Sequence, residues 1–171
     1  MTIAANDRSN PLAISSPLNL SVALTATIVT LIAWVGASVL MDFIIMPGLY
    51  ISGMMSDPGF ATAGDMIFSV FNRVELVAGA LVLSGALLWQ AIAPHRFSKQ
   101  AIITASLLMV IPLLYTYGLT PQMSALGIQL SLFETVEVPE TMDQLHYVYW
   151  SLEVLKLTVS GFLISRLWNR V

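Results

Sequence analysis

The chain lacks cysteine, and only 10% of its 171 residues are charged. The missing thiols exclude thiolate metal sites, iron–sulfur clusters and structural disulfides. The net charge of −3 argues against nucleic acid as a partner, because phosphate binding needs a basic face and the seven Lys and Arg residues are scattered. So short a chain also has no room for a soluble catalytic domain beside its apolar segments. These absences favour a non-enzymatic role, and no cofactor can be identified.

Hydrophobic residues make up 57% of the sequence, and its mean hydropathy is +0.81. They form blocks of about 20 residues or more, long enough to cross a hydrocarbon core about 30 Å thick. The pattern predicts an all-α, polytopic membrane four-helix bundle whose first partner is the lipid bilayer. The bundle is expected to occupy residues 20–171, with spanning helices over residues 20–50, 63–93, 101–120 and 144–167.

Three further segments are expected around these helices. Residues 1–19 are polar and contain two prolines, which is typical of a flexible tail. After Pro121, apolar residues recur at helical spacing, which predicts a short interfacial helix over residues 121–133. An acidic loop, Glu134 to Asp143, should then lead into the last spanning helix.

The basic residues predict the orientation. Lys and Arg in short loops are retained on the cytoplasmic side of a membrane. They occur in the tail, in the second loop and at the C-terminal end, whereas the first and third loops hold only acidic residues. We therefore expect both termini in the cytoplasm. The residues that carry this prediction are Arg8, Arg96, Lys99, Arg166 and Arg170.

Five ionisable residues fall inside the expected spans: Asp42, Arg73, Glu75, Glu153 and Lys156. A charge at mid-bilayer costs roughly 2.5–3.5 kcal/mol on insertion scales, whereas one large aliphatic residue returns only about 0.3–0.6 kcal/mol. The last helix therefore needs partners for its two charges. Comparable depth in the second helix suggests that Arg73 pairs with Glu153, or Glu75 with Lys156.

The predicted buried polar cluster has two interpretations. In the first, the ion pairs only fix the register of the helices. In the second, the cluster lines a polar cavity that opens to the outer face and binds an ion, a polar head group or a proton. Spacing in the sequence is compatible with both.

Near the start of the last helix, His146 shares a helical face with Asp143 and Glu153. Imidazole and carboxylate ligands suit a divalent metal, so Asp143, His146 and Glu153 are a candidate metal site. The alternative is a histidine at the membrane interface that binds nothing.

Aromatic residues gather near the predicted outer face: Tyr115, Tyr117, Tyr147, Tyr149 and Trp150. Rings with polar groups ordinarily settle at the level of the lipid head groups, so an aromatic belt is expected, although a lipid or quinone site would also use such residues.

Three short motifs occur in a familiar order: Met46-Pro47-Gly48-Leu49-Tyr50, Thr120-Pro121-Gln122-Met123 and Leu145-His146. In these the chain resembles the four-helix membrane proteins of the TMEM205-like, DUF4149 group. The resemblance implies an integral membrane protein without an established reaction. Eukaryotic members are linked to resistance toward platinum compounds, which implies export or metal handling. The chain departs from the group at Glu153, where asparagine is usual.

Two functions are therefore expected. The first is an accessory or structural subunit that packs within a membrane complex, beside other subunits or further copies of itself. The alternative is a small transporter or metal-handling protein that uses the buried Arg, Glu, Lys and His residues.

Overall fold

The computed structural model describes residues 17–54, 57, 59–92, 99–133 and 140–170, and these residues form helices and short connections without any strand. Two π-helical turns, η1 and η3, interrupt otherwise continuous helices. The elements in chain order are α1 (Pro17–Leu40), η1 (Met41–Ile45), α2 (Met46–Ile51), α3 (Phe60–Ile92), α4 (Lys99–Leu114), η3 (Tyr115–Leu119), α5 (Thr120–Phe133) and α6 (Glu140–Trp168).

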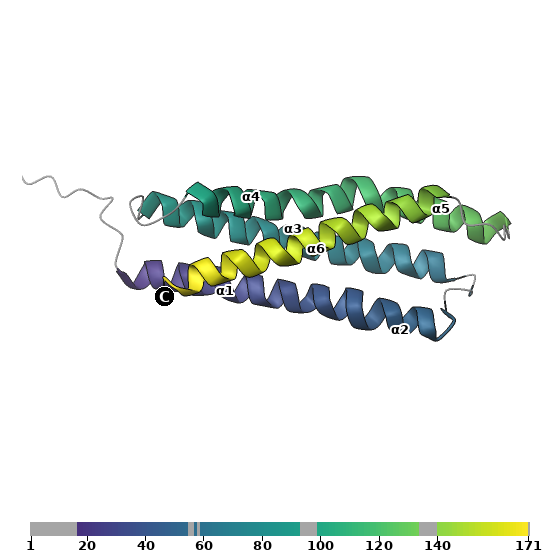
Figure 1. The fold of residues 1–171 in the computed structure, drawn as a ribbon, viewed down its shortest axis with the longest axis horizontal. Helices are drawn as coiled ribbons and strands as arrows, with labels where there is room; N and C mark the ends of the chain where they lie inside the picture. Colours follow the sequence, from purple (N-terminus) through teal and green to yellow (C-terminus); the bar gives the residue numbers. More distant parts are fainter. Residues whose placement is uncertain (1–16, 55–56, 58, 93–98, 134–139, 171) are drawn as a thin grey trace, which may run out of the picture.

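Four helical stretches are long and apolar enough to cross a membrane: Ser21–Ile51, Phe60–Ile92, Lys99–Leu130 and Glu140–Trp168. The predicted all-α multi-pass fold is thus confirmed. The start of α1 and the end of α6 lie at the same end of the bundle (Figure 1). An even number of spans requires this arrangement, and the side of the membrane that this end faces stays a prediction.

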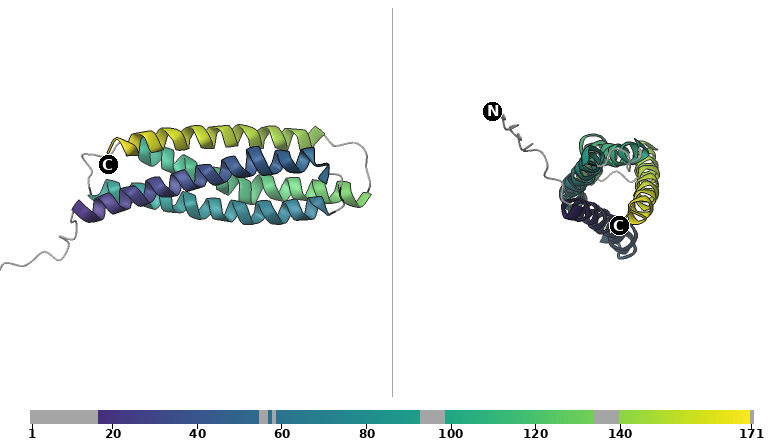
Figure 2. Two further views of the ribbon diagram at one scale, coloured as in Figure 1. Left: turned by 90° about the horizontal axis from the view of Figure 1, so that it is seen from below. Right: turned by 90° about the vertical axis from the view of Figure 1, so that its left-hand side faces the viewer.

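The four spans form a ring around a common axis, as the view along the bundle shows (Figure 2). α1 packs beside α3, α3 beside α4 and α5, and α6 closes the ring between α4 and α1. α3 and α6 therefore lie diagonally opposite each other, and their side chains can meet only at the centre of the bundle.

Several element boundaries differ from those expected. α3 begins at Phe60 and α6 at Glu140, so the first four residues of α6 come from the predicted acidic loop. α1 begins at Pro17, inside the predicted tail. The rest of the tail, residues 1–16, and the loop segments 93–98 and 134–139 lie outside the described residues.

The separate interfacial helix expected after Pro121 is replaced by a continuous helix. α4, η3 and α5 follow one another without a break, and Pro121 is the second residue of α5. Proline lacks an N–H group and is tolerated in the first turn of a helix, where that group has no partner in any case. Pro47 has the same place in α2, directly after η1. Each proline thus continues its helix after a π turn.

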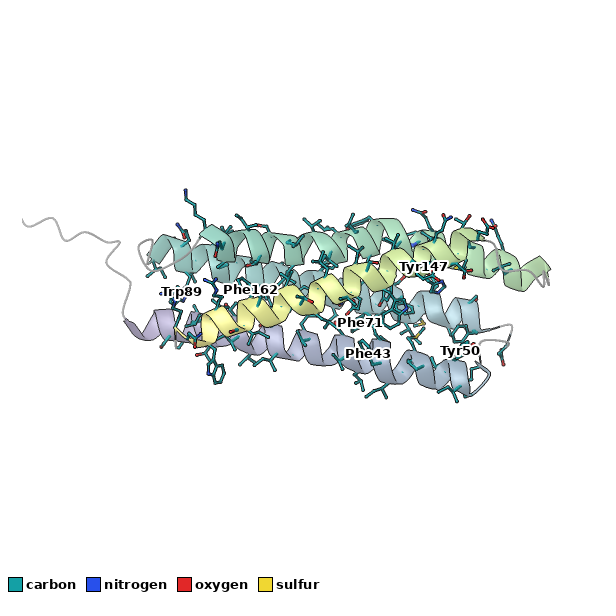
Figure 3. All side chains as sticks on the ribbon, in the orientation of Figure 1. Phe43, Tyr50, Phe71, Trp89, Tyr147 and Phe162 are labelled. Atoms are coloured by element: carbon teal, nitrogen blue, oxygen red, sulfur yellow. The ribbon has the colours of Figure 1, made fainter. Side chains whose placement is uncertain are left out.

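One half of the bundle, the apolar half, has a continuous hydrophobic core. Its α1 and α3 helices pack closely at Gly85, where a Cβ atom would overlap the Thr27 hydroxyl. Trp89 belongs to this half and lies near the left-hand end of the bundle in Figure 3. The buried residues of this core are Leu24, Ile28, Leu31, Trp34, Val82, Ala86, Trp89, Ala105, Leu108, Leu163 and Leu167.

The other half, which we call the loose half, has no buried core of its own and only packs Met123, Tyr149 and Leu152 against a small second core of Ile111, Tyr115 and Leu119. It comprises residues 43–51, 60–71, 121–130 and 140–152, and none of these side chains is buried. α2 packs against no helix other than the adjoining η1, and it diverges from α5 and α6 (Figure 1). Residues 140–152 alone span about 20 Å at 1.5 Å per residue. The interior of the bundle is therefore tightly packed in the apolar half and only partly covered by side chains in the loose half.

Candidate functional site

A cluster of ionisable side chains lies between the two halves, at the middle of the bundle. Asp42, Glu75, Glu153 and Lys156 are all buried, and they come from η1, α3 and α6. We call these four residues the ionic cluster. On one side of the cluster the helices bury side chains in the apolar half, and on the other side the residues of the loose half are not buried.

The position of Glu75 follows from the periodicity of α3. The buried residues of this helix recur every three or four positions, which is the spacing of one helical face. They are Asn72, Glu75, Gly79, Val82, Ala86 and Trp89. A carboxyl group therefore occupies a position that otherwise belongs to the core stripe of α3, and it has to be neutralised inside the bundle.

Lys156 joins the two diagonal helices. Its Nζ lies 2.5 Å from Oε1 of Glu75 and 2.7 Å from Oε2 of Glu153, and the Lys156 residue is 1% exposed. Glu153 precedes Lys156 by three residues on α6, a spacing that brings side chains together on a helix. Of the two ion pairs predicted between these helices, the structure contains Glu75–Lys156.

Two side chains of α1 complete the surroundings of Glu75. The indole N–H of Trp34 donates to Oε1 at 2.9 Å, and the hydroxyl of Ser38 donates to the same oxygen at 3.1 Å. Together with Lys156, three donors converge on one oxygen atom. Such charge-assisted hydrogen bonds are roughly twice as strong as neutral ones, so this oxygen is firmly held.

Glu153 and Lys156 share a second contact, the ring of Tyr115 in η3. Its hydroxyl donates to Oε2 of Glu153 at 3.2 Å, and Nζ of Lys156 lies 5.5 Å from the ring centroid. A cation at this distance is attracted to the electron-rich face of an aromatic ring. One tyrosine therefore stabilises both members of the ion pair on α6.

Asp42 connects to the cluster through Tyr149. The Tyr149 hydroxyl donates to Oδ1 of Asp42 at 2.6 Å, and its ring centroid lies 5.0 Å from that of Tyr115. Tyr149 is one helical turn before Glu153 on α6. The two tyrosines thus form a continuous polar and aromatic connection between Asp42 and the pair formed by Glu153 and Lys156.

The charges of the cluster do not balance. Three carboxylates and one ammonium group leave a net charge of −2 if all four are ionised. Each carboxyl group also has one buried oxygen without a hydrogen-bond partner: Oδ2 of Asp42, Oε2 of Glu75 and Oε1 of Glu153. Buried polar atoms are nearly always partnered, and an unpaired buried charge is costly. The cluster is therefore short of positive charge and of hydrogen-bond donors.

Arg73 does not belong to the cluster, contrary to the prediction. It is exposed, and within the described ranges it forms no ion pair. The predicted pair with Glu153 is therefore wrong. Successive residues of an α-helix turn by about 100°, so Arg73 lies about 160° around α3 from Glu75, on the opposite face of the helix. The prediction matched Arg73 and Glu153 by their depth in the membrane, but it did not consider which face of α3 carries Arg73.

The predicted metal site is not assembled either. His146 is exposed, and its Nδ1 lies 2.8 Å from the Met142 carbonyl oxygen, within its own helix. Asp143 is also exposed, whereas Glu153 is buried in the ionic cluster. Seven residues along a helix separate Glu153 from His146 by about 10 Å, too far for ligands of one ion. Among the described residues, no group of three or more His, Cys, Asp or Glu side chains could hold a metal ion.

The aromatic residues divide into two sets. Tyr117 and Tyr147 are each 75% exposed, as expected for a belt. Tyr115 is 1% exposed, and its contacts assign it to the cluster. Trp34 and Ser38 were not anticipated as cluster residues. Their spacing of four from each other, and of three between Leu31 and Trp34, was the available signal for one buried face.

The comparisons with known proteins add no relative. No protein-family model, no curated protein and no solved structure matches this chain. The functional argument therefore depends on the geometry of the ionic cluster.

Proposed function

We propose that this integral membrane protein is a small transporter in which the ionic cluster binds and releases protons. The observation that carries the proposal is the unpartnered oxygen on each of three buried carboxyl groups around a single lysine. A proton needs only one oxygen atom, whereas a metal ion needs several ligands around a common point. A proton thus suits these oxygens, and its binding reduces the excess negative charge. Intramembrane Asp and Glu residues commonly take part in proton relays in transporters.

Access to the cluster supports the same function. Among the described residues of the loose half no side chain is buried, whereas the apolar half is filled by its core. Because the four cluster residues are at most 2% exposed, proton entry requires a local opening of the bundle, which is easier on the side of the loose half. With the predicted topology, that side is the outer face. Release to the other side requires the apolar half to open, as alternating access demands.

The first two spans and the last two spans form two helix pairs that are built alike, which is also typical of a transporter. In each pair, the first helix has a π turn followed by a proline two residues later, Pro47 or Pro121. The second helix carries a buried glutamate at mid-span, Glu75 or Glu153. Corresponding helices are diagonal in the ring. Many transporters consist of two repeats with the binding site between them near the bilayer midplane, and π turns are frequent at functional sites.

Proton flux tests the proposal. Purified protein is reconstituted into liposomes that contain a pH-sensitive dye, and a pH gradient is applied together with a potassium diffusion potential. Wild type is expected to move protons faster than empty liposomes, and Glu153→Gln and Asp42→Asn are expected to lose this flux. Arg73→Gln is the matched control, because Arg73 is charged and at similar depth but outside the cluster. Flux that is absent in wild type, or unchanged in both cluster variants, contradicts the proposal.

An accessory subunit of a larger membrane complex is the second candidate function, and Arg73 favours it. A charged residue on the exposed face of a membrane-spanning helix is costly to leave in lipid, which favours a partner outside this chain. The two functions are compatible, since subunits of membrane assemblies can themselves conduct protons. The resemblance to the TMEM205-like, DUF4149 group agrees with either function and stays a proposal.

A further inference from the structure

The exposed face of α3 carries a charge near the middle of the membrane. Arg73 lies three residues, or about 5 Å, from the midpoint of α3, which is Leu76. A helix of 33 residues is about 50 Å long and extends beyond a hydrocarbon core of about 30 Å at both ends. Arg73 is therefore within the hydrocarbon region, where an arginine is among the costliest residues to expose to lipid.

The surroundings of Arg73 suit a second helix. On the exposed side of α3, two small residues four positions apart, Ala80 and Ser84, permit the backbone of another helix to approach closely in a membrane. All members are exposed, and their spacing of three or four keeps them in one stripe. We call this stripe the α3 outer face; it consists of Met66, Val70, Arg73, Val77, Ala80 and Ser84.

A second copy of this chain cannot neutralise Arg73. Within the spans, the acidic residues at mid-depth are Asp42, Glu75 and Glu153, and all three are buried in the ionic cluster. The acidic residue of α3 closest to Arg73 outside the cluster, Asp65, lies eight residues, or about 12 Å, toward the end of the helix. The anion that complements Arg73 must therefore come from a different molecule.

We propose that the α3 outer face docks a transmembrane helix of a different protein, and that this helix carries an Asp or Glu at the depth of Arg73. The guanidinium group forms bidentate hydrogen bonds with a carboxylate, which is a strong pairing in a site without water. Ala80 and Ser84 admit the partner backbone about two and three turns further along the face. The inference rests on the accessory-subunit role and is independent of proton binding by the ionic cluster.

Site-specific photo-crosslinking tests the inference in the membranes of the cells that make the protein. A benzophenone side chain replaces Val77, which is 60% exposed on the α3 outer face. The control replaces Val154, which is 59% exposed on α6 at similar depth. We expect the probe at residue 77, and not the probe at residue 154, to crosslink a membrane-spanning peptide of another protein that contains Asp or Glu. Mass spectrometry identifies the peptide.

If the inference is right, the crosslink at residue 77 depends on the positive charge of Arg73. Arg73→Gln should reduce the crosslink at least about tenfold, and Arg73→Lys should retain part of it. Arg73→Glu should abolish the crosslink, and replacing the partner's acidic residue with Arg should restore it. Gel filtration of each variant in detergent checks that the exposed substitution leaves the fold intact.

Four results overturn the inference: crosslinks to lipid only, crosslinks to a second copy of this chain, no crosslink at residue 77, or a protein crosslink that Arg73→Gln leaves unchanged. The liposome assay of proton flux contains no partner protein. The two experiments are therefore independent: a failed crosslink does not contradict proton transport, and absent proton flux does not contradict docking.

Discussion

The apolar half and the loose half are parts of the same four helices, but they are built on different principles. In the apolar half, large aliphatic and aromatic side chains fill the interior, and Gly85 allows α1 and α3 to approach closely. In the loose half, the same helices bury no side chain, and α2 diverges from the bundle. The ionic cluster lies at the border of the two halves, so its two sides are packed to different degrees.

This difference shows how a short chain can hold charges within a membrane. The packed half supplies rigidity, and it excludes water from the face of the cluster around Trp34 and Ser38. The loose half covers the side of Asp42 and Tyr149 with side chains that are at most partly buried. The ionic cluster therefore has one tightly packed side and one loosely packed side, although the chain has no large domain.

The largest expected effect follows removal of the only positive charge in the cluster. Lys156→Met leaves Glu75 and Glu153 without their counter-charge, which for a buried pair costs about 3–5 kcal/mol of unfolding free energy. The double variant with Glu75→Gln should recover part of that loss. Lys99→Met is the matched control, since Lys99 is exposed. Unfolding by increasing denaturing detergent measures all four proteins. Equal losses for Lys156→Met and Lys99→Met would show that the cluster is not a unit.

A smaller effect is expected from crowding the apolar half. Gly85→Ala places a methyl group on the Thr27 hydroxyl and should lower the unfolding free energy by about 1–3 kcal/mol. Thr27→Ala in the same chain should relieve most of this loss. Gly161→Ala is the control, because open space surrounds Gly161, and it should stabilise α6 by up to about 1 kcal/mol. The same unfolding assay applies, and an equal response at both glycines argues against close packing of α1 on α3.

Accessibility to a water-soluble reagent distinguishes the two halves. The chain has no native cysteine, so single cysteines can be introduced at Met123 in the loose half and at Leu163 in the apolar half. Met123 is partly exposed and Leu163 is 1% exposed. A small water-soluble thiol reagent should label Met123→Cys clearly faster than Leu163→Cys, as mass spectrometry would measure. Equal labelling rates would remove the distinction between the halves.

The smallest effect is expected at His146. Its side chain is exposed and contacts only its own helix among the described residues, so His146→Ala should change the unfolding free energy by less than about 0.5 kcal/mol. Calorimetric titration with zinc should give the same weak binding for wild type and variant. Strong zinc binding that disappears in His146→Ala would restore the metal site predicted from the sequence.

Much of the fold could be predicted because long apolar runs and their interruptions are properties of the sequence itself. The four spans and the depth of Glu75, Glu153 and Lys156 follow from counting residues. The direction in which each helix faces does not follow from depth. Arg73 was therefore assigned to the interior, although the two-residue spacing from Glu75 places the two on different faces.

The rest depends on contacts between helices that are distant in the sequence. Tyr115 belongs to the cluster because η3 turns its ring toward α6, and Tyr117 two residues later is exposed. Both residues look alike as members of an aromatic belt. The continuation of the third span past Pro121 likewise depends on a π turn, which composition does not reveal.

Proton binding by the ionic cluster is the central claim, and infrared difference spectroscopy measures it directly. The protein in lipid is taken through a cycle of pH, and the carbonyl stretch of protonated carboxyl groups is recorded. We predict a band that appears and disappears reversibly with pH in wild type and in Arg73→Gln, and that decreases in Asp42→Asn, Glu75→Gln and Glu153→Gln. A band that none of these three substitutions changes, or no reversible band at all, would contradict the account.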